Sequence, residues 1–327
     1  MSYSSFELLN HRQPILVFGR DGQVGRALHS CLKDTEVPAV FLGRADCDLA
    51  NESSLVKVLN RYQPQVILNA AAYTAVDKAE TEPNLAYAVN AKAPELMARY
   101  IANIAHGIFV HYSTDYVFAD TKQDAYLETD PVGPMGHLNI YGRSKLAAEQ
   151  AIEEVFDLIH DSGQKSHANK SAKYFILRTS WVYGDGNNFI RAILRLARGD
   201  DQLKVVTDQI GVPTSAQWLA KIGLQIADSR VKSGIYHVVP DGETSWHDLA
   251  AFVIKTLASY DKGFKIASKK ILPISANDYL VTARRPYNSR LNNAKLKRAL
   301  SQIAFTGPYP CWQDEVIAYI KDCINHS

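Results

Sequence analysis

The sequence predicts an α/β fold built on a doubly wound parallel sheet, with a smaller α/β lobe interleaved with it. Short apolar runs alternate with helical patterns along the first half of the chain, which is typical of βαβ units. A glycine-rich segment directly follows the first apolar run, where such a chain turns from strand into helix. A late apolar run, 234–239, has the pattern of a strand that returns to the main sheet.

The first strand is predicted at Ile15–Phe18, and glycines follow it at a spacing of three. The first glycine permits a tight turn, the second lets backbone approach a pyrophosphate, and the third lets the helix pack on the strand. The helix start supplies unpaired N–H groups for phosphate. The segment therefore predicts a Rossmann-type dinucleotide site made by Gly19, Arg20, Gly22, Gln23, Val24 and Gly25. The spacing differs from G-x-G-x-x-G, so an ordinary glycine turn is the alternative.

A second strand is predicted at Val37–Leu42, and Gly43-Arg44 follows it. An acidic residue at this point would bind the ribose hydroxyls of NAD. Arg44, with Arg20 nearby, instead suits the additional phosphate of NADPH, so NADPH is the expected cofactor, with NADH as a second option. Two solvated arginines are the alternative. Asp48 and Leu49 are expected beside the adenine.

The next strands end in residues suited to lining a ligand. Val66–Asn69 is followed by small residues, among which Ala71, Ala72 and Tyr73 are expected at the cofactor. A helix is predicted over 86–105. The strand that comes next carries Tyr112, a further expected cofactor contact, and leads to Thr114. In parallel sheets ligands bind at the carboxyl ends of strands, so these residues are expected at one edge.

Tyr141 precedes Lys145 by four residues on a predicted helix, which puts both side chains on one face. A free tyrosine has a pKa of about 10, and a nearby ammonium would lower it toward neutral pH. The pair is therefore expected to carry a proton beside a hydride carrier and to contact the cofactor. Without a preceding nucleotide site, the same spacing would more often belong to two surface residues with no function.

Together these motifs resemble the extended short-chain dehydrogenase/reductases and, within them, the dTDP-4-dehydrorhamnose reductase family. The resemblance covers nearly everything from about residue 14 to the end of the chain. It is carried by seven segments in order: 18–25, 69–80, 112–118, 138–145, 178–183, 208–214 and 284–291.

The resemblance implies NAD(P)H-dependent reduction of the C4 keto group of dTDP-4-dehydro-L-rhamnose to dTDP-L-rhamnose. It implies that Tyr141, Lys145 and Thr114 are catalytic. The substrate residues that it implies are Thr114, Asp115, Tyr116, Trp181 and Asn188. The sequence alone leaves open that Trp181 is only a core residue and that Thr114 only ends a strand, with no functional role for either. So do a reductase for another dTDP-4-keto-6-deoxyhexose and a non-catalytic subunit like the regulatory subunit of methionine adenosyltransferase.

One difference separates the chain from sugar-nucleotide dehydratases of the same superfamily. Those enzymes carry Asp-Glu after the strand-end threonine, and the two carboxyl groups move protons at C5 and C6. Here Tyr116 follows Asp115. Net reduction is therefore favoured over dehydration, unless Tyr116 is simply a packed side chain.

The predicted organisation is an N-terminal extension at 1–13, a nucleotide-binding domain at 14–181 and a mainly substrate-binding lobe at 182–327. A segment near 205–240 is expected to return to the first domain. Two departures from the family pattern are a long loop at 131–137, close to the site, and a polar insertion at 161–171. Helices are predicted at 216–227 and 245–257, the second beginning at Ser245.

Composition limits the function classes. A formal net charge of +2 over 327 residues and the lack of a basic aromatic patch argue against nucleic-acid binding. No apolar run is long enough to span a membrane, and no signal peptide is visible. The four scattered cysteines show no metal spacing and suggest reduced thiols in a cytoplasm. No metal ligands are expected, while Mg²⁺ use and a homodimer are options that the sequence leaves open.

Overall fold

The structure is a computed structural model. It describes residues 13–161, 172–198, 202–261, 271–279, 281–303, 305 and 308–325. Most of the predicted N-terminal extension and of the polar insertion at 161–171 lies outside the described residues.

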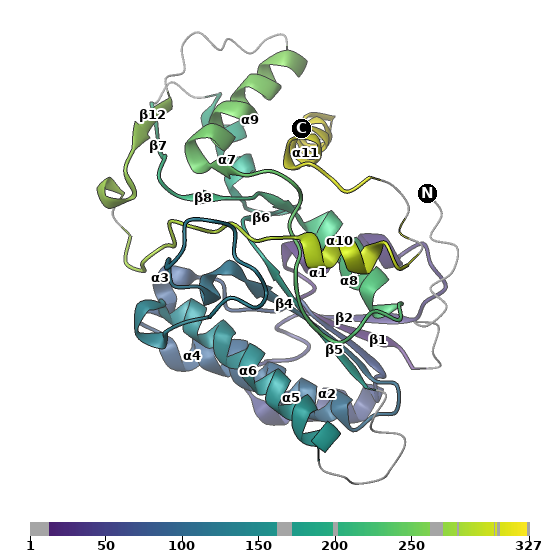
Figure 1. Cartoon of the computed structure of the whole chain (residues 1–327). Coiled ribbons are helices and arrows are strands. Elements are labelled where there is room, and N and C mark those ends of the chain that lie inside the picture. The colour runs from purple at the N-terminus through teal and green to yellow at the C-terminus, as the bar shows by residue number, and fades with distance from the viewer. Residues whose placement is uncertain are drawn as a thin grey trace.

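A six-stranded parallel sheet forms the centre of the molecule (Figure 1). Its strand order is β10-β5-β4-β3-β1-β2, so the chain winds outward in both directions from the middle. The strands are β1 (Ile15–Phe18), β2 (Ala39–Leu42), β3 (Val66–Asn69), β4 (Ile108–Thr114), β5 (Lys173–Thr179) and β10 (Gly234–His237). The predicted doubly wound α/β fold is confirmed, and β10 is the predicted returning strand, paired in parallel with β5.

Alternation along the strands sorts their side chains between two cores. Ile15 and Val17 pack into one core, whereas Leu16 and Phe18 pack into the other. Such two-sided burial explains why the strands read as continuous apolar runs. The same alternation puts Ile67 and Asn69 of β3 on the face that Leu16 shares.

Helices cover both faces of this sheet (Figure 1). On one face lie α1 (Gln23–Leu32), α8 (Ala216–Ala227) and α10 (Ala294–Leu300), whose apolar residues join the core of Ile15. On the other face lie α2 (Glu52–Tyr62), α5 (Ala93–Ala102) and α6 (Ile140–Asp161), whose apolar residues join the core of Leu16.

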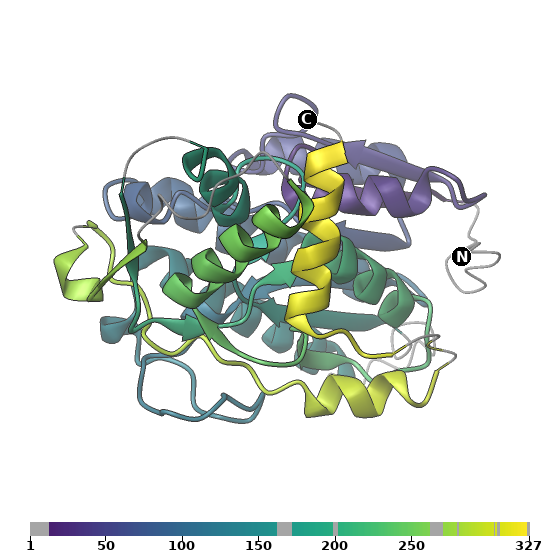
Figure 2. The same cartoon turned by 90° about the horizontal axis from the view of Figure 1, so that it is seen from above.

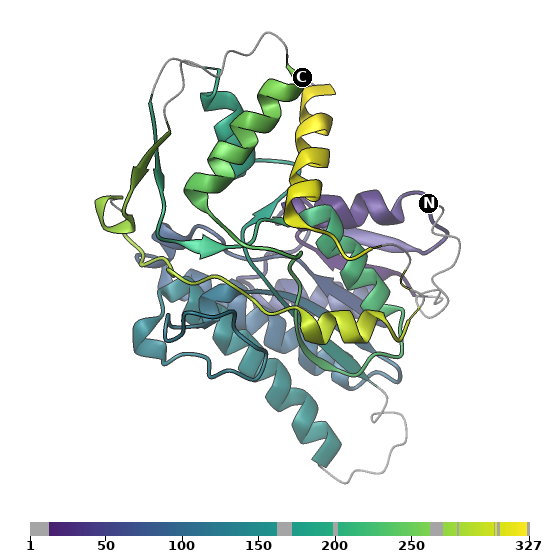
Figure 3. The same cartoon turned by 45° about the horizontal axis from the view of Figure 1, so that its top comes forward.

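A second lobe stands above the carboxyl edge of the sheet and has a core of its own. Its helices are α7 (Phe189–Leu196), α9 (Trp246–Tyr260) and α11 (Trp312–Asn325), and Figures 2 and 3 show α9 beside α11. Its short strands are β6 (Val182–Tyr183), β7 (Leu203–Val206), β8 (Ile210–Gly211), β9 (Thr214–Ser215), β11 (Thr244–Ser245) and β12 (Ile271–Ile274). The chain passes between this lobe and the sheet more than once, because α8, β10 and α10 return to the sheet. The boundary at residue 181 stays a prediction.

Two helix predictions are met closely: α8 spans the predicted residues, and Ser245 caps α9 by accepting the Asp248 N–H at 2.9 Å. The helix predicted over 86–105 is confirmed for residues 86–102, but it begins earlier and is not a regular α-helix throughout. The chain there forms α4 (Pro83–Tyr87), a π-helical turn (Ala88–Lys92) and then α5. Pro94 has no N–H to donate four residues back, and the Ala93 N–H bonds five residues back to Ala88 O.

The remaining elements within the described residues are α3 (Val76–Ala79) and 3₁₀ turns at Asp115–Val117, Met135–His137 and Ala276–Asp278. Within the described part of the chain, no helix has the length and apolar character needed to cross a membrane.

Candidate active site

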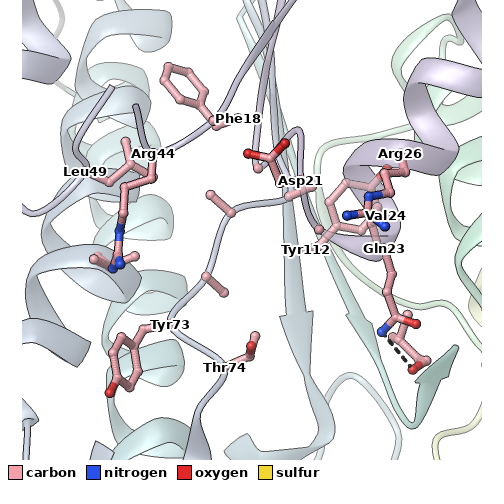
Figure 4. Close-up of a pocket in the computed structure, with 18 of the residues that line it drawn as sticks. Phe18, Asp21, Gln23, Val24, Arg26, Arg44, Leu49, Tyr73, Thr74 and Tyr112 are labelled. Carbon is pink, nitrogen blue, oxygen red and sulfur yellow. Dashed lines mark hydrogen bonds between the residues drawn. The ribbon is translucent and has the colours of Figure 1, made fainter. Parts of the chain in front are cut away.

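A cavity of about 740 Å³ opens at the carboxyl edge of the sheet. It is lined by the turns that follow β1, β2 and β3, by the start of α6, and by residues after β5 and β6. Figure 4 shows Arg44 and Tyr73 on one side of it and Gln23 and Arg26 on the other. The residues of the predicted site that line it are Gly19, Gly22, Gln23, Val24, Arg44, Asp48, Leu49, Ala71, Ala72, Tyr73, Tyr112, Tyr141 and Lys145.

The glycine-rich turn has no room for side chains at two positions. Gly19 has a φ of +92°, and a Cβ there would lie 2.6 Å from the Ala71 nitrogen. A Cβ on Gly25 would overlap the Gly19 carbonyl. Gly25 does not line the cavity, because it is the point where α1 packs against the turn. These contacts explain why glycine recurs at this spacing.

The two arginines in the turns after β1 and β2, Arg20 and Arg44, have different surroundings. Arg20 forms ion pairs with Asp21 at 3.2 Å and with Asp46 at 2.8 Å, and it does not line the cavity. Asp46 also accepts the Gly43 N–H at 2.9 Å, which fixes this turn. Arg44 extends along the cavity wall beside Leu49 toward Tyr73 (Figure 4). Of the two, Arg44 is therefore the guanidinium that a ligand in the cavity would meet.

The start of α6 carries Tyr141 and is held by side chains from outside the helix. Asn139 accepts the Gly142 N–H at 2.7 Å, and Glu80 accepts the Ile140 N–H at 2.8 Å. Ser144 donates to the Tyr141 carbonyl at 2.8 Å. The bonds to Glu80 and Asn139 satisfy N–H groups that the first turn of a helix leaves open, and so they help to fix where the Tyr141 phenol lies.

Asn90 ties the π-helical turn to the same site. Its amide accepts the Tyr73 N–H at 2.7 Å and donates to Tyr73 O at 3.1 Å and to Ser144 at 3.0 Å. It therefore joins the turn after β3 to α6. Sequence reasoning did not identify Asn90, because the irregular turn that aims it inward has no pattern of its own.

Tyr141 and Thr114 are brought together, as predicted. Tyr141 is half-buried and lines the cavity, and its side chain lies near that of Thr114 at the end of β4. Loss of hydration raises the pKa of Tyr141 to about 12, although the nearby Thr114 hydroxyl acts to lower it. The predicted lowering of this pKa by Lys145 is wrong for the structure described here.

Lys145 is buried one turn further along α6, with 1% of its surface exposed. Its Nζ lies 2.7 Å from the Tyr112 carbonyl and 2.9 Å from Nε2 of His111. Burial lowers the pKa of Lys145 to about 7, and the nearby charge of Glu149 offsets only part of that effect. The bonds of the lysine go to β4, and the groups that shift the Tyr141 pKa beside its burial are Thr114 and Asp115.

Asp115 and Tyr116 lie beside Thr114 but do not line the cavity. Asp115 is buried and accepts the Thr114 hydroxyl at 3.1 Å, and burial raises its pKa to about 7. Tyr116 packs edge-on against Tyr141, with ring centroids 5.5 Å apart. Burial raises the Tyr116 pKa well above its ordinary value.

Trp181 and Asn188 lie on the lobe side. Trp181 has a φ of +47° and stacks on Trp246 at 3.7 Å, and Gly211 leaves the space that its indole fills. Asn188 caps α7 by accepting the Arg191 N–H at 3.0 Å, and its NH₂ group donates to Gly184 O at 2.8 Å. Neither lines the cavity. The neighbours of Asn188 that do are Asp185, Gly186 and Asn187, which sequence reasoning missed although Gly184-Asp-Gly marks a turn.

No metal-ligand cluster of three or more His, Cys, Asp or Glu side chains occurs within the described ranges.

The comparisons with known proteins agree with this geometry. The family model of the RmlD substrate binding domain matches residues 13–324. The chain belongs to this family.

Members of the family and solved structures match over most of the chain. A dTDP-4-dehydrorhamnose reductase of Shigella flexneri is 39% identical over 307 residues, which is 91% of this chain and 94% of the relative. The enzyme of that name from Burkholderia thailandensis is 36% identical, covering 95% and 99%. The structure of dTDP-4-dehydrorhamnose reductase from Bacillus anthracis in complex with NADP has a TM-score of 0.77 and 31% identity, covering 95% and 99%. The resemblance seen in the sequence is thereby confirmed.

Proposed function

We propose that the chain is an NAD(P)H-dependent oxidoreductase that reduces the C4 keto group of dTDP-4-dehydro-L-rhamnose to give dTDP-L-rhamnose. The observation that carries the proposal is the Tyr141–Thr114 pair beside a cavity built for a dinucleotide, in a chain of the RmlD family. The relatives that share this architecture are named for that reaction, and one of them was solved with NADP.

The residues of the cavity fit a nicotinamide dinucleotide. Gly19 and Gly22 leave the backbone of the turn open to a pyrophosphate, and the start of α1 directs its N–H groups there. Arg44 suits a 2′-phosphate, and Asp48 and Leu49, which also line the cavity, would lie beside the adenine. When bound, the reduced cofactor supplies the hydride for C4.

The chain itself would handle the proton. The Tyr141 phenol, with its pKa of about 12, is protonated at neutral pH and is the group that gives a proton to the C4 oxygen. The Thr114 hydroxyl, on turning from Asp115, would donate its hydrogen bond to that oxygen and stabilise the charge that develops on it. Lys145 is the group that binds the nicotinamide ribose. Asp115, Tyr116, Trp181 and Asn188 stay proposed substrate contacts, with Asn188 acting through the turn that it holds.

Dehydration of a nucleotide sugar is less well supported by the same residues. It requires proton carriers for C5 and C6. Asp115 is one candidate, but the next side chain, Tyr116, is packed against Tyr141 and has a raised pKa. One proton donor is enough for reduction, and Tyr141 is that donor.

The direct test mixes the purified chain with NADPH and dTDP-4-dehydro-L-rhamnose and follows the loss of reduced-cofactor absorbance. We expect one equivalent of NADPH to be consumed per sugar, and dTDP-rhamnose to be formed. A parallel sample with dTDP-glucose and oxidised cofactor should yield no 4-keto-6-deoxy product. Cofactor that binds without turnover on any 4-keto-6-deoxyhexose nucleotide would instead indicate a regulatory subunit.

We further propose a cytoplasmic location, in line with the buried thiols of Cys31 and Cys47.

A further inference from the structure

One contact in the wall of the cavity joins the sheet domain to the second lobe and has no part in the chemistry described so far. Arg26 of α1 pairs with Asp185, which follows β6, at 3.6 Å between Nη1 and Oδ2. Both residues line the cavity, and Figure 4 shows Arg26 on the same side of it as Gln23. Nε2 of Gln23 donates to the Val182 carbonyl at 3.3 Å. The first turns of α1 are therefore fastened to the lobe at two points.

Arg26 stands close to the start of α1, where a negative group is favoured. The helix begins after Gly22 with no side-chain cap and no acidic residue in its first turn. Its first N–H groups and the positive end of its dipole therefore attract an anion. The Arg26 N–H donates to Gly22 O at 3.0 Å, so Arg26 stands one turn along the helix, and side chains on a helix lean toward its N-terminus. The guanidinium can thus reach the place to which the open N–H groups point.

Asp185 is an unexpected side chain in this wall, because a carboxylate repels the pyrophosphate that the proposed cofactor would bring. Asp185 has a second partner, Arg191 of α7, at 3.3 Å. Nε of Arg191 donates to the Tyr319 hydroxyl at 2.8 Å, and that hydroxyl donates to the Gly184 carbonyl at 2.6 Å. Asp185 therefore keeps a firmly held partner within the lobe when Arg26 is withdrawn.

The contact between Arg26 and Asp185 is weak enough to be exchanged. Their side chains are 45% and 67% exposed, and an exposed ion pair adds little to stability, because water screens it and side-chain entropy opposes it. A pyrophosphate in the cavity offers the guanidinium charge-assisted hydrogen bonds that can be bidentate. Arg26 therefore gains by leaving Asp185 for the pyrophosphate.

We propose that Arg26 is a cofactor-binding residue that exchanges Asp185 for the pyrophosphate when the dinucleotide enters. The inference rests on the proposed function, which places the dinucleotide in this cavity. Arg26 recognises the group that NADPH and NADH share, whereas Arg44 recognises the 2′-phosphate of NADPH alone. Asp185 competes for the guanidinium, and so it limits the affinity for the cofactor and helps the cofactor to leave.

The test compares the Kd values of the full-length chain, without a sugar, for NADPH, NADH and adenosine 2′-monophosphate, which lacks the pyrophosphate. Arg26→Met keeps the length of the side chain and removes its charge. It should raise the Kd of both dinucleotides by about 10- to 100-fold, as expected for lost charged hydrogen bonds, and leave that of the monophosphate within about twofold. Arg195→Met, at an exposed position on α7 that does not line this cavity, should change none of the three.

Asp185→Asn keeps the shape of the side chain and removes the competing charge. It should lower the Kd of both dinucleotides by about two- to fivefold, the range in which an exposed ion pair competes. Since affinity changes at one site fall mainly on the dissociation rate, NADPH release followed by stopped-flow fluorescence should slow by the same factor. Thermal unfolding of both free variants should match that of the wild type, because the pair is exposed.

An unchanged dinucleotide Kd in Arg26→Met would overturn the proposal, as would an equal loss for adenosine 2′-monophosphate. Weaker dinucleotide binding in Asp185→Asn would overturn the exchange, because Asp185 would then support the cofactor. A wild type that binds neither dinucleotide would refute the proposed function itself. Normal wild-type turnover together with an unaltered Kd in Arg26→Met would refute this inference alone.

Discussion

The glycine-rich wall of the cavity and the buried group around Tyr141 differ in what fixes their geometry. In the wall, backbone meets backbone: a Cβ on Gly19 would lie 2.6 Å from the Ala71 nitrogen. Around Tyr141, side chains hold one another: Thr114 bonds to Asp115 at 3.1 Å, and Lys145 bonds to His111 at 2.9 Å. Adding atoms to the wall should therefore lower folding stability and cofactor binding. Removing polar atoms from the buried group should lower activity.

The largest effect is expected from removing the phenol oxygen. Tyr141→Phe should lower kcat by about 10² to 10⁴, because a general acid is lost, while the Kd for NADPH changes little. Steady-state kinetics and cofactor titration measure the two quantities. Tyr260→Phe, at an exposed position on α9, is the matched control and should keep full activity. A wild-type kcat in Tyr141→Phe would remove the phenol from the mechanism.

Adding one methyl group to the wall should have the next largest effect. Gly25→Ala forces a Cβ onto the Gly19 carbonyl and should cost about 1 to 3 kcal/mol of folding stability, with weaker cofactor binding. Gly136→Ala is the control, since a Cβ there meets nothing within 4 Å. Thermal unfolding with and without NADPH compares the two. Equal behaviour of the two variants would show that the turn tolerates a side chain.

The same contrast explains what the sequence could predict. Gly19, Gly22 and Gly25 mark the wall by their spacing alone, and the apolar strands that flank them predict the sheet. That Tyr141 and Thr114 meet at one edge of the sheet follows from strand order, which the alternating pattern also predicts.

The surroundings of Lys145 could not be predicted in this way. Its bond to His111 depends on the register of β3 against β4 and on the face to which each strand residue points. The spacing of residues within one helix predicts neither of these. For the same reason the sequence predicted a lowered Tyr141 pKa where burial raises it. The π-helical turn that aims Asn90 inward likewise has no repeating pattern.

Substitution of Arg44 tests whether a side chain of the cavity wall selects NADPH over NADH. Arg44→Ala should weaken NADPH binding about 10- to 150-fold more than NADH binding, because a charged hydrogen bond to the 2′-phosphate contributes about 1.5 to 3 kcal/mol. Fluorescence titration with both cofactors gives the ratio. Arg61→Ala, on α2 and away from the cavity, should leave that ratio unchanged. Equal losses for the two cofactors would show that Arg44 does not read the phosphate.

The buried lysine predicts a pH dependence of stability. Its pKa of about 7 in the folded chain lies below the unfolded value of about 10.4, so the unfolded chain binds more protons between these pH values. The unfolding free energy of the wild type should therefore rise relative to Lys145→Met, by at most about 1.4 kcal/mol per pH unit. Urea unfolding of both proteins at pH 7, 8 and 9 measures the difference. A difference that is flat with pH would mean that Lys145 stays charged when buried.

The most direct test of the central claim follows one hydrogen atom. NADPH deuterated at the transferring position is mixed in a single turnover with dTDP-4-dehydro-L-rhamnose and the wild-type chain, and the sugar is then read by NMR. The account predicts one deuterium at C4 of dTDP-rhamnose with the wild type, and a much slower appearance of the same label with Tyr141→Phe. Product without deuterium at C4, or equal rates from the two proteins, would contradict it.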